Sequence, residues 1–171
     1  MKAQLSRRLH KNDIREIIRS MAEKHTEPAM LYRLLYDEDK RVSDNAAWVL
    51  THLNPSETQW LPDKREELTD KAMHTGSETQ RRLLLTLLLR CPSSEENLRT
   101  DFLDFCLTHM YSTKEPTSIK CLYMKLAYEQ CKLFPELASE LRKALELMEN
   151  DLPAGMKSTR KNILRQLRSD Y

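Results

Sequence analysis

The residues best suited to contact a ligand include an acidic, an aromatic and an imidazole side chain on one helix face. Asp44, Trp48 and His52 follow one another at i, i+4 and i+8, so they form one column on a helix. A Trp beside a carboxylate could stack on a base, a sugar or a partner side chain. The alternative is that Trp48 packs between neighbouring helices. Asp44 and Trp48 are therefore candidate binding residues.

A second set of candidate binding residues is basic. On the last predicted helix, Lys157, Lys161, Arg165 and Arg168 fall within an arc of about 80°. Lys125 and Lys132 lie on nearly one line of an earlier helix, and Arg81 and Arg82 precede a Leu-rich segment. These cations could bind an anionic partner, or each could pair with acidic residues on neighbouring helices.

The sequence contains no recognisable catalytic or metal-binding motif. Nothing in it supplies a nucleophile, a base and a group that orients the base together. The four cysteines are spaced 15, 15 and 10 residues apart, without a C-x-x-C pair or matching histidines. We therefore expect no catalytic residue, no metal ion and no cofactor.

Composition indicates that helices position these side chains. The chain has 2 Gly, 28 Leu and 2 Val, which favours an all-α protein, because Leu is a strong helix former and β-branched residues favour strands. Ser56, Ser77 and Ser93 each begin a capping box, and prolines stand near expected first turns. The predicted helices span 12–25, 28–36, 40–53, 56–74, 77–91, 94–112, 115–133, 135–150 and 154–168.

Alternate predicted helices align at a nearly constant period. Val42, Gln80, Ile119 and Thr159 are separated by 38, 39 and 40 residues, and a period of about 40 is typical of helical repeat arrays. The segment 37–50, DEDKRVSDNAAWVL, resembles the second-helix signature of HEAT repeats. In that family an Asp in the turn precedes a Val-Arg pair, which is followed by small residues and Leu. Here Ser43 takes the place of the usual Arg.

The resemblance implies a right-handed α-solenoid of about four HEAT-like helix pairs with an N-terminal capping helix. We expect one domain over 1–171, with the cap at 1–27 and repeats at about 28–53, 54–91, 92–133 and 134–168. An irregular helical bundle is the alternative, but bundles rarely keep a constant period over four helix pairs.

Charge segregates between the two helices of the predicted repeats. Over the last three repeats the first helices sum to −8 and the second helices to +9, although the whole chain carries only +2. In a HEAT-like solenoid the second helices line the concave surface, so we predict a basic concave groove. Such a groove concentrates oppositely charged partners.

These observations favour a non-catalytic interaction or scaffold module that binds an acidic protein or peptide. Nucleic-acid binding through the same cations is the alternative. A less favoured alternative is a glycosylase like those of DNA-alkylation repair, whose residue types only Asp44 and Trp48 match. No apolar segment is long enough to span a membrane. We therefore expect a soluble, cytoplasmic monomer without membrane contact, and the partner's identity stays open.

Overall fold

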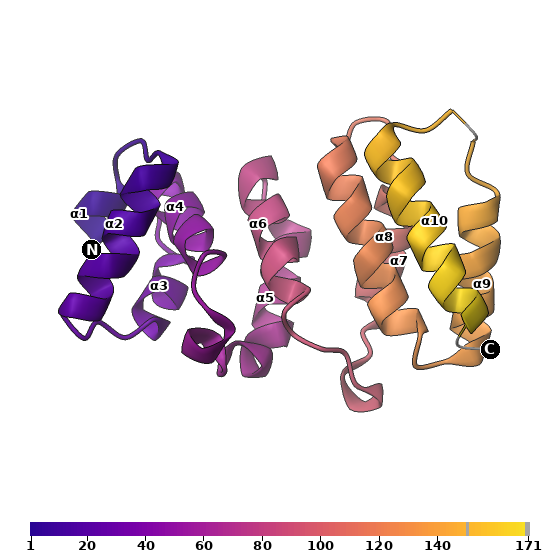
Figure 1. Ribbon diagram of the computed structural model, residues 1–171, viewed down its shortest axis with the longest axis horizontal. Helices are drawn as coiled ribbons and strands as arrows, with labels where there is room; N and C mark the ends of the chain where they lie inside the picture. Colours follow the sequence, from indigo (N-terminus) through magenta and orange to yellow (C-terminus); the bar gives the residue numbers. More distant parts are fainter. Residues whose placement is uncertain (150, 170–171) are drawn as a thin grey trace. The chain divides into compact units, whose positions relative to one another are not determined.

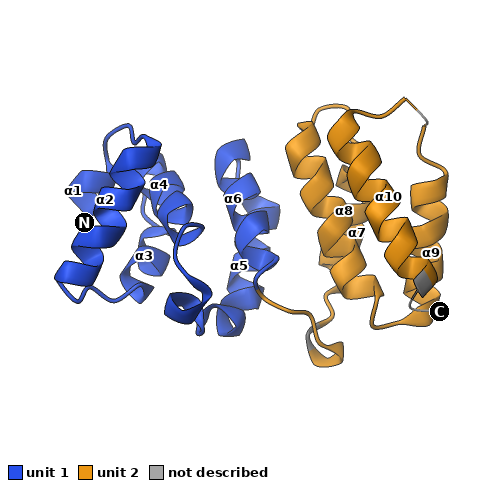
Figure 2. Ribbon diagram, in the orientation of Figure 1, with its two compact units in different colours: residues 1–90 blue, residues 91–171 orange. Residues whose placement is uncertain are grey.

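The computed structural model describes residues 1–149 and 151–169 (Figure 1). Within these residues the chain forms ten α-helices and three 3-10 turns and no strand, so the all-α prediction is confirmed. The chain divides into two compact units, residues 1–90 and 91–171 (Figure 2). The division falls within one residue of the boundary predicted between the second and third repeats. The grouping of all repeats into a single domain stays a prediction.

Helix α4 is central to unit 1, residues 1–90. This unit contains α1 (Lys2–Leu5), α2 (Lys11–Glu23), α3 (Ala29–Leu34), α4 (Lys40–Leu50), η1 (Pro55–Thr58), η2 (Leu61–Lys64), α5 (Arg65–His74) and α6 (Glu78–Leu88). Helix α4 packs against α1, α2, α3 and α6. Val42, Ala46 and Leu50 follow at i, i+4 and i+8 on one face of α4 and are completely buried.

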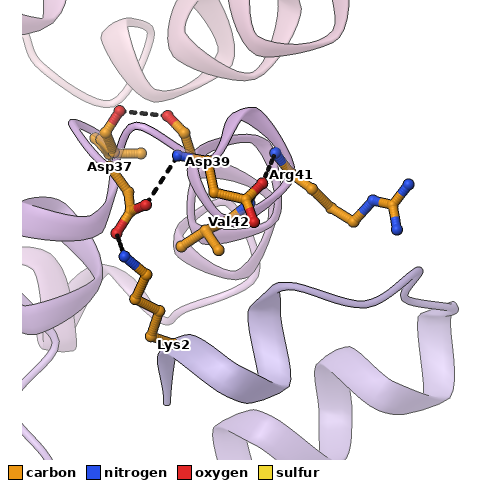
Figure 3. Close-up of polar contacts among 7 residues, drawn as sticks. Lys2, Asp37, Asp39, Arg41 and Val42 are labelled. Atoms are coloured by element: carbon orange, nitrogen blue, oxygen red, sulfur yellow. Dashed lines mark hydrogen bonds and ion pairs between the residues drawn. The ribbon is translucent and has the colours of Figure 1, made fainter.

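The acidic turn before α4 begins this helix and ties it to the N-terminus (Figure 3). The Asp39 carboxylate accepts hydrogen bonds from the backbone N–H groups of Arg41 at 2.8 Å and Val42 at 3.4 Å. Asp37 accepts from the backbone N–H of Asp39 at 2.9 Å and pairs with Lys2 at 2.8 Å. The hydrogen bond from Lys2 lowers the pKa of Asp37. Asp39 therefore caps the helix, while Asp37 holds α1 beside it.

The helix predicted over 56–74 is wrong in its first half. Residues 55–58 and 61–64 form the two 3-10 turns, and the α-helix begins only at Arg65. Pro62 explains the difference, because proline lacks an N–H and its ring clashes with a carbonyl one turn earlier. The capping box predicted at Ser56 is also wrong, since Asn54 and Glu57 form it instead.

Unit 2, residues 91–171, contains two helix pairs. Its elements are η3 (Glu95–Asn97), α7 (Thr100–His109), α8 (Thr117–Cys131), α9 (Pro135–Glu146) and α10 (Ala154–Ser169). Helix α8 packs against α7, α9 and α10. The α-helix predicted to begin at residue 94 is wrong: only the 3-10 turn η3 lies there, and α7 begins at Thr100 after the extended backbone of Arg99. The end predicted for α9 at residue 150 lies outside the described residues, and the helix ends at Glu146.

The N-terminal segment and the Leu-rich helix both contribute to the core of unit 1. Ile14, Ile17 and Met21 of α2 are buried, and so are Leu5 and Leu9 before it. Five leucines of α6 within 83–89 are at most 3% exposed, which confirms this helix as part of the core. Ser77 caps α6 by accepting a hydrogen bond from the backbone N–H of Gln80.

A buried polar link joins α4 to α6. The hydroxyl of Ser43 donates to the Leu35 carbonyl and accepts from the side-chain amide of Gln80. The amide oxygen of Gln80 in turn accepts from the Thr75 hydroxyl at 2.6 Å. Ser43 and Gln80 are 3% and 5% exposed. An Arg at position 43 would have to bury its charge here, so the departure from the family signature fits this packing.

We expect Ser43→Ala to lower the free energy of unfolding of unit 1 by about 1–3 kcal/mol, because the buried amide of Gln80 would lose its acceptor. Urea titration followed by the fluorescence of Trp48 and Trp60, both in unit 1, measures this. Ser20→Ala on α2 is the matched control and should change stability by less than about 0.5 kcal/mol. Equal stability of the two variants would contradict the role given to Ser43.

Candidate functional site

Several arginines contact helix ends within their own unit and are therefore not freely available to a partner. Each donates hydrogen bonds to carbonyl oxygens at the C-terminal end of a neighbouring helix. The pairs are Arg65 with Leu88, Arg81 with Ala72 and Thr75, Arg90 with Leu50, Thr51 and Leu53, Arg142 with Leu167, and Arg160 with Glu146 and Met148. These carbonyls have no partner inside their own helix, so the arginines serve as side-chain caps.

Unit 1 contains a groove of about 840 Å³ along the side of α4. Its lining comes from the segment between α1 and α2, from α4 with its capping residue, and from α6. The lining residues are Ser6, Arg8, Leu9, Asp39, Lys40, Arg41, Asp44, Asn45, Trp48, Thr79, Arg82 and Leu83. The predicted residues Asp44, Trp48 and Arg82 are thereby brought together in one place.

Asn45 positions the wall of the groove that comes from the N-terminus. Its side-chain amide donates to the backbone carbonyls of Leu5 at 2.7 Å and Arg7 at 2.9 Å. Arg7 also pairs with Asp13 at 2.8 Å, which fixes the segment at its other end. Arg8 and Leu9 are consequently held beside α4.

The groove carries four cations that lie outside any ion pair, although Lys40 is attracted by the carboxylate of Asp44 one turn along α4. Arg8, Lys40, Arg41 and Arg82 are exposed, and none of them forms an ion pair with a described residue. In Figure 3 the guanidinium of Arg41 extends away from the acidic turn. Such unpaired cations leave a positive potential that an anionic ligand can neutralise.

Two carboxylates also line the groove, and both already accept hydrogen bonds. Asp39 caps α4, and Asp44 accepts from the hydroxyl of Ser77 at 3.1 and 3.2 Å. Burial raises the pKa of Asp44, while the hydrogen bond from Ser77 acts in the opposite direction. Asp44 therefore connects α4 to the start of α6.

Trp48 gives the groove an aromatic surface with an available donor. The indole is half-buried, and its ring meets that of His52 edge to face at a centroid distance of 6.1 Å. Its ring N–H has no acceptor among residues 1–149 and 151–169. Leu9 and Leu83 lie in the same lining and are 7% and 3% exposed. An apolar side chain with a nearby acceptor would fit this floor.

A second basic surface lies on α10 in unit 2. A shallow depression of about 510 Å³ is lined by Lys157, Arg160, Lys161, Leu164, Arg165 and Arg168. Lys157 is 3.9 Å from Asp151, whose side chain is fully exposed. Lys161, Arg165 and Arg168 form no ion pair with any residue that the structure describes. The predicted stripe on this helix is therefore present as a continuous surface.

The other predicted cations lie outside both surfaces. Lys125 is exposed on α8, and Lys132 pairs with Glu129 at 2.7 Å and lies 5.9 Å from the centre of the Tyr128 ring. Arg81 is partly buried as the cap of α5. The binding roles given to these three residues stay predictions.

Sequence reasoning missed Arg8, Lys40, Arg41 and Arg160. Lys40 and Arg41 share with Asp44 and Trp48 the side of α4 that faces the groove, so helical periodicity could have found them. Arg8 depends on the tertiary contacts of Asn45 and has no comparable local signal.

Neither a metal centre nor a membrane span is found among the described residues. No group of three or more His, Cys, Asp or Glu side chains is placed to hold a metal ion. No described helix is long and apolar enough to cross a bilayer. Cys91, Cys106 and Cys131 are buried free thiols, and Cys121 is half-buried.

Comparison with known proteins identifies one family. The family model of the HEAT repeat domain matches residues 1–167. No curated protein and no solved structure matches the chain. The family match covers the segment that carries the repeat period, and with the all-helical structure it confirms the predicted α-solenoid class.

The adjacent residues Arg81 and Arg82 should differ in their effect on stability when substituted. We expect Arg81→Gln to lower the free energy of unfolding by about 1.5–3 kcal/mol, because charged donors to the carbonyls of Ala72 in α5 and of Thr75 just after it are lost. Arg82→Gln should change stability by less than about 0.5 kcal/mol. Thermal unfolding monitored by circular dichroism measures both. Equal losses of stability in the two variants would contradict a capping role for Arg81 and an exposed position for Arg82.

Asp44→Asn should stabilise the protein at neutral pH, because it removes a partly buried charge and keeps an oxygen that can accept from Ser77. A carboxyl whose pKa is raised by folding binds more protons in the folded state, so its unfavourable contribution disappears as pH falls. The difference in free energy of unfolding between Asp44→Asn and the parent protein should therefore shrink as pH falls through the titration range of Asp44. Urea titrations at several pH values test this, and an advantage that grows toward low pH would contradict it.

Proposed function

Because the chain belongs to the HEAT repeat domain family, whose repeats form scaffolds for interactions, we propose that it binds an acidic protein segment in the groove along α4. Four unpaired cations around the half-buried Trp48 carry this proposal. The carboxylates of the segment would neutralise Arg8, Arg41 and Arg82, and one apolar side chain would pack on the indole. The role is non-catalytic.

The groove combines the two features that peptide recognition requires. Its apolar floor provides a place to bury a side chain, and aromatic and arginine side chains frequently contribute most of the energy at protein interfaces. Its cations lie around that floor and would select acidic sequences and speed association. A cation rim without the indole would bind any polyanion equally well.

Asp39 and Asp44 favour a peptide over a nucleic acid in this groove. A nucleic acid brings a charged phosphate with every nucleotide, so a strand laid along α4 would place phosphates beside these carboxylates. A peptide carries charges only where its sequence has Asp or Glu. A neutral residue of the peptide can therefore lie beside Asp44.

The same geometry assigns Asp44 a structural role and not the role of a catalytic carboxylate. Its oxygens accept from Ser77 at the start of α6, and Ser77 accepts from Gln80 within that helix. We propose that this connection fixes the spacing of the two helices that form the groove. Peptide binding should then survive Asp44→Asn.

The test follows peptide binding by the fluorescence of Trp48. Trp60→Phe leaves Trp48 as the remaining tryptophan, and Trp60 lies outside the lining of the groove. A synthetic peptide of alternating Glu and Ser around one central Leu should change the Trp48 fluorescence and bind saturably. Arg41→Glu with Arg82→Glu, in the same background, should weaken binding by about tenfold or more, since two attractive contacts become repulsive.

Two controls separate the groove from net charge. Arg15→Glu with Arg33→Glu makes the same charge change at exposed residues of unit 1 outside the groove, and should alter affinity by less than about threefold. Replacing the central Leu of the peptide by Ser should weaken binding to the parent protein. Equal losses in both charge variants, or a nucleic acid that binds the groove more tightly than the peptide, would overturn the proposal.

A further inference from the structure

Helix α10 presents two different stripes of exposed side chains. One stripe is cationic and consists of the exposed residues Lys157, Lys161, Arg165 and Arg168, beside Arg160, whose guanidinium reaches the end of α9. The other consists of the exposed side chains of Ser158, Asn162 and Gln166, which follow at i, i+4 and i+8. The acidic-peptide groove of unit 1 involves neither stripe.

Packing leaves most of the circumference of α10 open. Met156, Thr159, Ile163 and Leu167 are the buried residues of this helix. Near its start, a Cβ on Gly155 would lie 3.8 Å from Cys121 on α8, and Arg160 reaches the carbonyls at the end of α9. At 3.6 residues per turn the exposed positions cover roughly two-thirds of the helix surface.

The cationic stripe is long and contains no opposing charge. Helix α10 has five basic residues and no Asp or Glu. From Lys157 to Arg168 the stripe extends about 16 Å, at 1.5 Å per residue. Duplex DNA carries one negative charge per about 1.7 Å of its axis, so this length faces on the order of ten phosphates. The groove of unit 1 contains two carboxylates, so its charge is not uniformly positive.

We infer that α10 binds duplex DNA, with its cations on backbone phosphates and its Ser, Asn and Gln side chains at base edges in the major groove. An α-helix with side chains is about 10–12 Å across, and the major groove of B-DNA is about 12 Å wide. Phosphate contacts position a helix, and base contacts specify the sequence. Asn and Gln each pair with adenine through two hydrogen bonds.

The uncharged stripe favours DNA over other polyanions. An acidic protein would need only the cations, whereas Asn162 and Gln166 provide the donor and acceptor groups that match base edges. Duplex RNA has a deep and narrow major groove that side chains cannot read. The two stripes lie side by side, so one docking orientation can use both.

The first experiment measures the electrostatic contribution to DNA affinity. It follows the fluorescence anisotropy of a labelled duplex of about 20 base pairs at salt concentrations between about 50 and 200 mM. Four phosphate contacts predict a slope of about −4 for log affinity against log salt. Lys161→Glu with Arg165→Glu should weaken binding at least about tenfold and reduce the magnitude of that slope by about 2.

Lys114→Glu with Lys143→Glu is the matched control within unit 2. Both lysines are exposed, form no ion pair with described residues, and lie outside the lining of the α10 surface. This variant should keep affinity within about threefold and leave the slope unchanged. Circular dichroism of both variants should show unaltered unfolding, because the substituted side chains are exposed.

The second experiment tests the uncharged stripe with a random-sequence duplex pool. The parent protein should enrich particular sequences from the pool. Asn162→Ala with Gln166→Ala should bind the unselected pool with affinity within about twofold of the parent, and should lose about tenfold preference for the enriched sequences.

Three results would overturn the inference. Equal weakening by the control pair and the α10 pair would show an effect of net charge. Binding of poly-glutamate as tight as that of the duplex, with the same loss in the Lys161/Arg165 variant, would identify an acidic protein ligand. Failure of the parent protein to enrich any sequence would show that the interaction is nonspecific attraction. None of these results would bear on peptide binding by unit 1.

Discussion

The carbonyl groups at the ends of the helices impose the constraint on which the rest of this structure depends. Each helix leaves its last carbonyls without an intrahelical partner, and many proteins satisfy them with a glycine in the left-handed conformation. This chain has only 2 Gly, and neither has a positive φ. At the end of α2, His25 takes the left-handed conformation in place of a glycine. At several other helix ends guanidinium groups from neighbouring helices supply the donors, as Arg90 does for α4 and Arg81 for α5. The hydrogen bonds that cap one helix therefore also hold the neighbouring helix in position.

Helix capping by arginine divides the basic residues into two classes. Some cap a neighbouring helix, and the others stay exposed and form the two basic surfaces. Because an α-helix turns by about 100° per residue, adjacent positions face different surroundings. Arg81 turns toward the end of α5, and Arg82 turns toward the groove. On α10, Arg160 reaches the end of α9, while Lys161 stays exposed. A charge sum over a helix counts both classes together, although only the second can attract a partner.

Local patterns in the sequence predicted the helices well and the groove only in part. Asp39 and Ser77 cap residues two or three positions further along the chain, and the leucines of α6 form a continuous apolar segment. Roles that depend on such neighbouring residues can be predicted from the sequence. The misjudged segment over 56–64 had a local cause as well, since Pro62 cannot continue an α-helix. The position of Arg8 depends on an amide 37 residues away in the chain, at Asn45. Only the fold brings Arg8, Arg41 and Arg82 together.

The contrast between the two basic surfaces explains why net charge alone says little about function here. In unit 1 the cations surround an indole and two carboxylates, so a ligand must offer negative charge at some points and apolar or neutral groups at others. On α10 the cations form an unbroken stripe beside uncharged hydrogen-bonding side chains, which suits a ligand of regular charge with polar edges. A protein segment meets the first requirement and a DNA duplex meets the second. The arrangement of neutral groups among the cations therefore discriminates between ligands more sharply than the number of cations does.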